Sequence, residues 1–447
     1  MISIAVLAAC SSKYASSSNG LVVVSSQGNG IMDTFSLDLG NGHVTEINNV
    51  NGPPTPGVPT SVVLDPAGAY AYVATSLSCT PKLPANTSLE GAAQGGVLVY
   101  AIASDGKLGT AAITFLPGNP AYANSGFPTC GLDDATNPNA GNVPTALVID
   151  SAGKYLFVAT GQAGVTYTAN LGSTPVSTSA TLDSIGIVVY AIGSNGTLTQ
   201  VPGSPFALTT PLGGYAPTPS ALAVTPTIYP VAFALCSGNV PPTTENLYVT
   251  DSANYLVFNY SVSSAGALSL TMPAPLTPGV ATGTVPSGVT VDPCNRFVYV
   301  SNGQPNNSVS AYTICSVISL PTCPNADFSL LPVSGSPFTA GTGTGPLGPL
   351  LMDAFANFLY VLNTGQGAIE AYKVSTTTGS LAPLTTTPVV TNGFPSAMAI
   401  RNDDSWMFVT NTNEANLSEY AITPSTGALT PQPPVQTDNT PWGVAVK

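Results

Sequence analysis

The chain has 447 residues, and its charged residues are few and mainly acidic: 8 Lys and Arg stand against 21 Asp and Glu, for a net charge of −13. Nucleic acids and polyanionic ligands are bound through clustered Arg and Lys, so this composition argues against both as partners. Apolar residues occur in short runs, and none reaches the roughly 20 residues that a membrane-spanning helix needs.

The N-terminal segment is short and apolar and ends in Leu-Ala-Ala-Cys10, ahead of a Ser-rich stretch. It resembles the lipobox of bacterial lipoproteins, in which the cysteine is lipidated after cleavage, although no Lys or Arg precedes the apolar run. We expect residues 1–19 to be a signal remnant and tether, with lipidation at Cys10 as the only membrane attachment. Export to the outer membrane, the cell surface or the periplasm follows from this interpretation. The alternative is an ordinary apolar terminus.

A repeated unit organises the remainder, residues 20–447. Each copy has an apolar run after a proline, a reversal of the Asp-Pro-x-Gly kind, an aromatic run, a tyrosine-containing run and a Gly-x-Leu turn. The copies begin at Pro59, Pro144, Pro219, Pro286, Pro346 and Pro395, with a partial copy at Pro441. Four short strands per copy, without a helical pattern, predict the blades of a propeller.

The two ends of the chain complete the ring. Residues 21–47 have the second, third and fourth strands of a blade, and residues 442–446 have the first strand alone. We therefore predict an all-β, seven-bladed propeller with four antiparallel strands per blade. It is a single domain over residues 20–447, whose last blade is closed by the N- and C-terminal strands.

Cysteine positions predict disulfides. In a propeller, the loops from second to third strand and from blade to blade share one face, here called the loop face. The other two kinds of turn share the opposite face, the turn face. Six cysteines remain beside Cys10, an even number in a chain that looks exported. Sorting them by face favours three pairs: Cys79–Cys130, Cys236–Cys294 and Cys315–Cys323. The alternative is six reduced, buried thiols.

The long insertions gather on the loop face, which favours this face as a binding surface. The second strands also end there, at six polar residues that form our candidate ligand-binding ring: Thr75, Thr160, Asp251, Asn302, Asn363 and Asn411. The alternative interpretation is that these side chains hydrogen-bond their own turns. One insertion contains Asp133, Asp134 and Asn137, oxygen ligands of the kind that Ca²⁺ prefers, without the EF-hand spacing. No cofactor is required by the sequence, and Ca²⁺ is the one metal it suggests.

Catalytic motifs are scarce. The only histidine, His43, lies in a hairpin turn, and no Gly-x-Ser-x-Gly elbow accompanies it. The only arginines, Arg296 and Arg401, fall at the turn face. Trp406 and Trp442 occur at strand positions, where packing between blades is the favoured interpretation. Whether the protein is an enzyme is therefore left open by its residues.

The aromatic-Val-Thr-Asn endings carry a family resemblance. Residues 408–411 and 299–302 are the clearest cases, and with the Asp-Pro-x-Gly, Tyr-x-Ile and Gly-x-Leu elements they resemble the YVTN-type repeats of seven-bladed lactonase-like propellers. That family includes 6-phosphogluconolactonase, a muconate-lactonising cyclase and surface proteins. Its enzymes act on anionic substrates and are expected to present basic residues, which this chain almost lacks.

Three functions are compatible with these observations. We expect first an exported, lipid-anchored propeller that binds a protein or a neutral polar ligand, or acts as a scaffold, through its loop face. The second is a lactonase that hydrolyses a sugar lactone or a related lactone on the same face. The third is a self-assembling subunit of a surface layer or filament.

Overall fold

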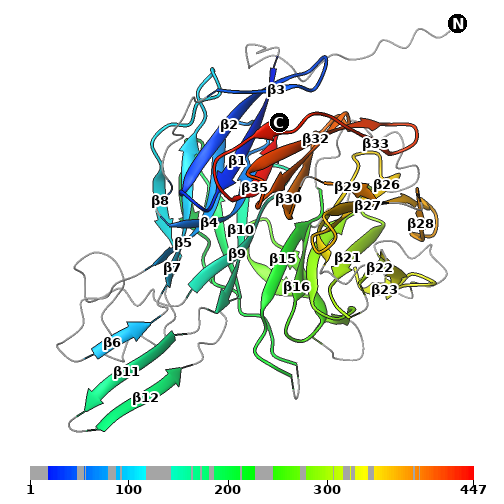
Figure 1. The fold of residues 1–447 in the computed structure, drawn as a ribbon. Helices are drawn as coiled ribbons and strands as arrows, with labels where there is room; N and C mark the ends of the chain where they lie inside the picture. The colour runs from blue at the N-terminus through cyan, green and yellow to red at the C-terminus, as the bar shows by residue number, and fades with distance from the viewer. Residues whose placement is uncertain are drawn as a thin grey trace, which may run out of the picture.

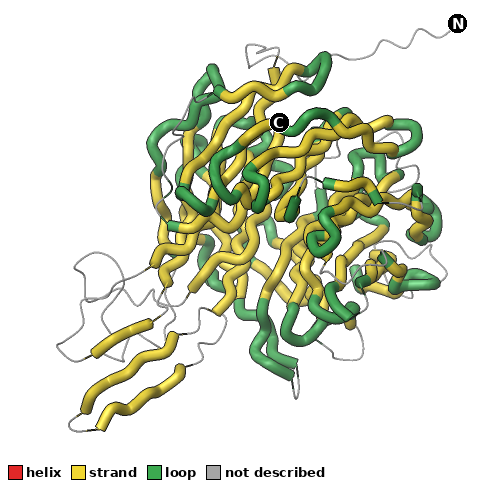
Figure 2. The backbone as a smooth tube through the Cα atoms, viewed as in Figure 1, coloured by secondary structure: helices red, strands yellow, loops and turns green. Residues whose placement is uncertain are grey.

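The computed structural model describes residues 19–47, 55, 57–78, 87–90, 93–116, 142–162, 165–171, 174–180, 186–211, 214–226, 245–271, 278–305, 307–315, 323, 328–340, 347–385, 388–391 and 393–447. These residues form strands and turns (Figure 2). No helix long and apolar enough to cross a membrane is present among them.

Seven antiparallel four-stranded sheets make up the fold (Figure 1), and each corresponds to one copy of the repeat. We number them blades 1–7, with blade 7 built from both ends of the chain. The first strands are β4 (Val58–Leu64), β9 (Asn142–Ile149), β15 (Pro219–Val224), β20 (Pro286–Val291), β25 (Leu347–Met352), β30 (Pro395–Ile400) and β35 (Pro441–Val446). The second strands are β5 (Tyr70–Ser78), β10 (Tyr155–Gln162), β16 (Glu245–Asp251), β21 (Phe297–Asn302), β26 (Phe358–Asn363), β31 (Trp406–Asn411) and β1 (Asn19–Ser26).

The third strands are β7 (Ala93–Ala101), β13 (Gly186–Ile192), β17 (Leu256–Val262), β22 (Ser308–Ile314), β27 (Ala368–Val374), β32 (Asn416–Thr423) and β2 (Ile31–Asp38). The fourth strands are β8 (Ala112–Phe115), β14 (Leu198–Gln200), β18 (Leu268–Leu270), β23 (Leu330–Pro332), β28 (Leu381–Pro383), β33 (Ala428–Pro431) and β3 (Val44–Glu46).

Shorter strands supplement the blades. In blades 3 to 6 a two-residue strand extends the outer edge of the third strand: β19 (Val280–Ala281), β24 (Phe338–Thr339), β29 (Val389–Val390) and β34 (Val435–Gln436). A separate sheet joins insertions of blades 1 and 2, in the order β12 (Thr174–Ala180), β11 (Val165–Leu171) and β6 (Thr87–Glu90). Figure 1 shows this sheet apart from the ring of blades.

The first strands lie innermost and close a ring. Each contacts the first strand of the blades before and after it, and β35 contacts β4. Strand β1 pairs with β35 in antiparallel register, from Val22 opposite Val446 to Ser26 opposite Pro441. This pairing joins the two ends of the chain in blade 7, so the predicted seven-bladed architecture and its mode of closure are confirmed.

Aspartate fixes the reversal between first and second strands. In blade 1, one carboxylate oxygen of Asp65 accepts the backbone N–H groups of Ala69 and Tyr70, at 2.6 and 2.7 Å. Asp353 does the same for two backbone N–H groups in blade 5, both at 2.7 Å. The carboxylate thus satisfies donors that a tight turn leaves unpaired, which explains why aspartate recurs at this position.

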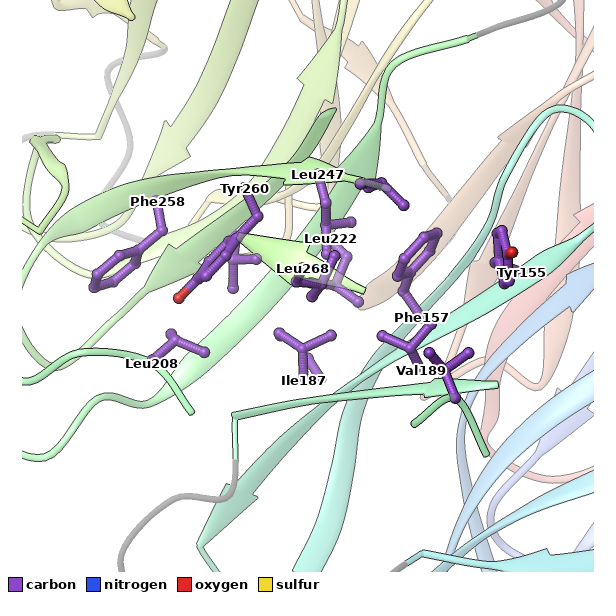
Figure 3. Close-up of a cluster of buried hydrophobic side chains, with 14 residues drawn as sticks. Tyr155, Phe157, Ile187, Val189, Leu208, Leu222, Leu247, Phe258, Tyr260 and Leu268 are labelled. Carbon is purple, nitrogen blue, oxygen red and sulfur yellow. The ribbon is translucent and has the colours of Figure 1, made fainter. Parts of the chain in front are cut away.

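The core lies between neighbouring blades. Figure 3 shows the cluster between blades 2 and 3, where Phe157, Ile187 and Val189 face Leu247 and Phe258. Because each sheet packs on both faces, its central strands are apolar on both sides rather than alternating. The sequence predicts packing on both faces, since the strands are continuous apolar runs.

The Gly-x-Leu turn holds neighbouring blades together at the turn face. In blade 6, Gly427 has φ +68°, and a Cβ atom there would lie 2.5 Å from the ring of Phe358 in blade 5. The hydroxyl of Tyr360, also in blade 5, donates to the carbonyl of Gly427 at 2.9 Å. Only glycine suits both the backbone conformation and the close approach, which explains its recurrence in the repeat.

The start of one repeat copy is corrected by the structure. Leu347 pairs with Asn363 as Pro286 pairs with Asn302, so the copy in blade 5 starts at Leu347. The predicted start, Pro346, is one residue too early and lies outside the described residues. Proline occupies this position in the other blades because the first strand lies at the edge of its sheet. No backbone N–H group is needed there for pairing with a neighbouring strand.

One of the three predicted disulfides is present in full. Cys315 and Cys323 are bonded, with an S–S distance of 2.05 Å. Cys294 is also disulfide-bonded, but Cys236, the partner expected from the sequence, lies outside the described residues, so that pairing stays a prediction. The Cys79–Cys130 pair and the lipidation site Cys10 fall outside them as well.

Candidate functional site

Four of the six polar residues of the predicted ring end their second strands at the loop face, whereas β5 and β10 continue for two or three residues beyond Thr75 and Thr160. All six are buried, at most 1% exposed. The hydrogen bonds described for these side chains lie within their own blades. The amide of Asn302 donates to the Ser310 hydroxyl at 3.0 Å and accepts the N–H of Gly283 at 3.0 Å. Asp251 accepts the N–H of Thr218 at 2.8 Å. These contacts are those of the alternative interpretation, in which the side chains organise their own loops. Ligand binding by the ring stays a prediction.

Every blade has a register shift where its first strand begins, of the kind a β-bulge produces. The residue at this position is Thr60, Thr145, Ser220, Ser287, Gly348, Ser396 or Trp442, in the order of the blades. In five blades it is Ser or Thr, and its hydroxyl donates to the backbone carbonyl of the residue that opens the next blade, at 2.6–3.1 Å. We call this set of bonds the hydroxyl girdle.

Blade 7 departs from the girdle. Its bulge residue is Trp442, which cannot make the hydroxyl bond and is 38% exposed. The link from blade 7 to blade 1 is made instead by the side-chain amide of Gln27, which donates to the carbonyl of Pro59 at 2.7 Å. Trp406 is buried in the cluster between blades 6 and 7, as predicted. The expectation that Trp442 is likewise packed away is wrong.

A carboxyl pair lies beside this bulge. Asp33 on β2 is buried, and its Oδ2 accepts the Ser26 hydroxyl at 3.2 Å and the backbone N–H of Asp438 at 3.1 Å. The backbone contact brings the carboxyl group of Asp438 close to that of Asp33, so a negative charge on one disfavours a negative charge on the other. Burial, reinforced by the Asp438 carboxyl, raises the pKa of Asp33 to about 7.

The exposed indole and the carboxyl pair share one corner of the loop face. Strands β35, β1 and β2 are neighbours in blade 7 (Figure 1). Pro441 pairs with Ser26, and Asp33 pairs with Val24. Two strand spacings, about 10 Å, therefore separate the backbones of β35 and β2. Asp438 is only partly buried, so the pair can be reached from solvent. We call Ser26, Asp33, Asp438 and Trp442 the blade 7 site.

Sequence reasoning missed this site because the ring of second-strand ends directed attention to the other six blades. The site could have been found by comparing the repeats position by position, because two of its residues depart from the repeat. Trp442 stands where most blades have Ser or Thr, and Asp33 stands on the third strand where blades 4 and 6 have Ser310 and Ser418.

Basic residues gather at the opposite face. Six of the eight are described, and each lies at a turn-face end of a strand or in a turn-face loop: Lys107, Lys154, Arg296, Lys373, Arg401 and Lys447. Lys154 donates to the carbonyl of Ser264 in the next blade at 2.6 Å. Arg296 pairs with Asp292 at 2.6 Å and donates to the carbonyl of Thr376 at 2.9 Å. The turn-face placement predicted for both arginines is confirmed, and Lys13 and Lys82 lie outside the described residues.

Other buried acids lie between blades, away from this corner. Burial raises the pKa of Glu245 to about 8, and nearby Asp150 adds to the shift. Burial also raises the pKa of Glu419, in blade 6, to about 7. His43 is exposed in the turn between β2 and β3 on the turn face. These residues are too dispersed to form a second constellation within the described chain.

No group of three or more His, Cys, Asp or Glu side chains that could hold a metal ion occurs in the described part of the chain. The loop with Asp133, Asp134 and Asn137 falls outside it, so Ca²⁺ binding there stays a prediction.

A comparison with protein families finds one match, to part of the chain. The family model "Lactonase, 7-bladed beta-propeller" matches residues 336–446, which span blade 5, blade 6 and the C-terminal strand of blade 7. The resemblance to the lactonase-like propellers is confirmed. The matched segment includes Asp438 and Trp442.

Solved structures share the fold of this seven-bladed propeller. A protein of Lactobacillus plantarum is 14% identical with a TM-score of 0.61, and the alignment covers 96% of this chain and 99% of that one. A candidate 6-phosphogluconolactonase of Bacteroides fragilis is 15% identical with a TM-score of 0.61, covering 97% and 99%. The periplasmic gluconolactonase of Pseudomonas aeruginosa is 16% identical with a TM-score of 0.61, covering 96% and 99%. At these identities the similarity concerns the fold, and no curated protein matches the sequence.

Proposed function

We propose that this lactonase-like propeller hydrolyses a lactone at the blade 7 site. The observation that carries the proposal is the buried carboxyl of Asp33, which is held by the Ser26 hydroxyl and the Asp438 backbone N–H beside a second carboxyl group. Burial raises the pKa of Asp33 to about 7, so this carboxyl can hold or release a proton near neutral pH. The match of residues 336–446 to the lactonase family supports the choice of reaction. It favours the hydrolytic function over the binding protein that composition suggests first.

The reaction needs one proton acceptor and one proton donor. Water adds to the lactone carbonyl carbon, and the bond between that carbon and the ring oxygen breaks. The ionised carboxylate of the pair takes a proton from the attacking water, and the protonated carboxyl gives its proton to the departing ring oxygen. The pair gains one proton and loses one, so the enzyme returns to its starting state with a hydroxy acid as product.

The surroundings orient the pair. The Ser26 hydroxyl and the Asp438 backbone N–H both donate to Oδ2 of Asp33, which leaves Oδ1 as the atom available for the second carboxyl or for water. Ser26 is fully buried and ends β1, so its hydroxyl is held by the sheet rather than by a loop. This arrangement fixes the tilt of the Asp33 carboxyl, as proton transfer requires.

The test measures lactone hydrolysis with purified protein by pH-stat titration. We expect Asp33→Asn and Asp438→Asn each to lower kcat by about 10²-fold or more, the usual contribution of a positioned acid or base. Asp105→Asn is the matched control, because Asp105 forms an exposed ion pair with Lys107 on the turn face. Wild-type activity that survives in Asp33→Asn would contradict the proposal. Addition of Ca²⁺ or a chelator tests separately whether the loop at Asp133 matters.

Lipid anchoring at Cys10 and export to the cell surface or periplasm are further proposals, supported by the lipobox-like residues that precede Cys10. Labelling with a fatty-acid analogue, compared between the natural chain and Cys10→Ala, tests the lipid anchor. Fractionation of the labelled cells tests export. Equal labelling of the two proteins, or retention in the cytoplasm, argues against them.

A further inference from the structure

We propose that the blade 7 site takes an uncharged lactone whose ring lies against the exposed face of Trp442, rather than a phosphorylated sugar lactone. This inference rests on the proposed function and names its substrate class. Three independent observations carry it: the position of Trp442 in the repeat, the distribution of basic residues, and the apolar residues around the ring of first strands.

The first observation is the bulge position. Five of the seven bulge residues have a hydroxyl that links one blade to the next, so the fold has a use for Ser or Thr there. Trp442 gives up that bond and exposes a large aromatic side chain instead. Bulges redirect a side chain out of the sheet and are common beside active sites. The replacement link through Gln27 keeps the ring closed without help from residue 442.

The second observation concerns charge. Recognition of a phosphate depends on Arg or Lys, or on backbone N–H groups at a helix N-terminus. The described residues form no helix, and all six described basic residues lie at the turn face. Three of them are bonded to carbonyl groups of a neighbouring blade: Lys154, Arg296 and Lys447. At the blade 7 site a phosphate would instead meet the acidic pair of Asp33 and Asp438, which repels it.

The third observation is the rim. The residue just before the opening proline is apolar and strongly exposed in three blades: Val58 at 43%, Val285 at 45% and Phe394 at 45%. Val58 begins an innermost strand, and Val285 and Phe394 come directly before one. Trp442 is the second residue of another innermost strand, so all four belong to the same end of the ring. Sites for small uncharged ligands are lined by such apolar and aromatic side chains, with a few polar groups that fix orientation. The carboxyl pair would supply those polar groups.

The first arm of the test compares substrates. We expect kcat/KM for glucono-1,5-lactone to exceed that for its 6-phosphate by at least about tenfold, because the phosphate gains no cation at the site and faces two carboxyls. A preference for the phosphorylated lactone overturns the inference. The variant Lys82→Ala then shows whether the preference comes from a lysine outside the described residues.

The second arm replaces the indole. Trp442→Ser gives blade 7 the residue that blades 3, 4 and 6 have at the same position, so we expect an intact fold. KM for the uncharged lactone should rise about tenfold, the equivalent of one aromatic contact, while kcat changes little. Trp442→Phe should restore most of the affinity. An unchanged KM in a folded Trp442→Ser protein contradicts the role of the indole.

The third arm separates this inference from the proposed hydrolysis. The neutral glucono-1,5-lactam cannot be hydrolysed as a lactone, and its binding is followed by tryptophan fluorescence. The wild type should respond, whereas Trp442→Phe, which keeps only the buried Trp406, should not. Lactam binding without any lactone turnover removes the hydrolytic function but leaves the binding of an uncharged ring at Trp442. If the protein hydrolyses lactones but its fluorescence response to the lactam does not depend on Trp442, the role of Trp442 is contradicted and the proposed hydrolysis is not.

Discussion

Replacement of Asp33 by asparagine should stabilise the protein at alkaline pH while it lowers kcat by about 10²-fold or more. Asparagine has nearly the same shape, can accept the bonds from Ser26 and from the Asp438 backbone, and can donate to the Asp438 carboxylate. It differs in that it cannot ionise. The variant therefore removes the cost of a buried negative charge and leaves the packing of blade 7 unchanged.

The magnitude follows from the pKa. Burial and the neighbouring carboxyl raise the pKa of Asp33 from 3.8 to about 7, a difference of about three pH units. Each unit is worth 1.36 kcal/mol, so above pH 7 the ionised residue costs the fold at most about 4 kcal/mol, and about 2 kcal/mol if screening by solvent halves the effect. Because the folded pKa is the higher one, the stabilising contribution is complete below pH 4 and is lost as pH rises through 7.

Urea unfolding followed by tryptophan fluorescence tests this reasoning at pH 4 and pH 9. At pH 4 both proteins have an uncharged side chain at residue 33, so their free energies of unfolding should be equal. At pH 9 we expect Asp33→Asn to be more stable by about 2–4 kcal/mol. A variant that is equally or less stable at pH 9 refutes the assignment, since it means that the ionised Asp33 is well stabilised in the fold. If the variant is more stable at pH 9 but keeps full activity, the raised pKa of Asp33 is supported, and Asp33 has no role in the reaction.

Three further predictions concern the propeller as a whole. Tyr360→Phe should cost about 1 kcal/mol in the free energy of unfolding, because its hydroxyl is bonded to the next blade. Tyr248→Phe should be neutral or stabilising, because the buried Tyr248 hydroxyl has no hydrogen-bond partner among the described residues. Loss of the Cys315–Cys323 disulfide, in the double replacement by alanine, should cost about 2.5 kcal/mol by chemical denaturation, the chain-entropy value for a loop closed at a separation of 8; no change would point to compensating strain. Glu245→Gln should remove part of a fall in stability between pH 5 and pH 9, because burial raises the Glu245 pKa to about 8 and the contribution is lost as pH rises through that value; identical pH profiles of the variant and the natural protein would falsify the shift.

The repeat made the architecture predictable. Each copy contains its own turn signals, and the strand lacking from residues 21–47 matches the one supplied by residues 442–446, so both the number of blades and the closure could be derived. The arginines could be placed at the turn face for the same reason, since topology assigns every turn to one of two faces.

The candidate site was less predictable because it depends on departures from the repeat. The second-strand ends drew attention as polar residues near an edge, but a polar residue at that position is also what a turn needs, as the contacts of Asn302 demonstrate. The meaning of Trp442 depends on a bulge, and that of Asp33 on a partner more than 400 residues away in Asp438. Neither can be recognised from local sequence, because a bulge and a long-range pair become visible only when strands are placed side by side.

The pairing of β1 with β35 also has a consequence for how the protein is made. Leu21 and Lys447 exchange backbone hydrogen bonds at 3.2 and 2.9 Å, so the partners of this seam are far apart in the sequence. The nascent chain cannot close its ring until β35 has been synthesised, and the contacts across the seam raise the contact order, which slows folding. A circular permutant that joins residues 447 and 19 through an Asp-Pro-Ala-Gly turn, copied from blade 1, would turn the seam into an ordinary hairpin. Its refolding rate, set against that of the natural chain, would report what closure by the two ends costs in time.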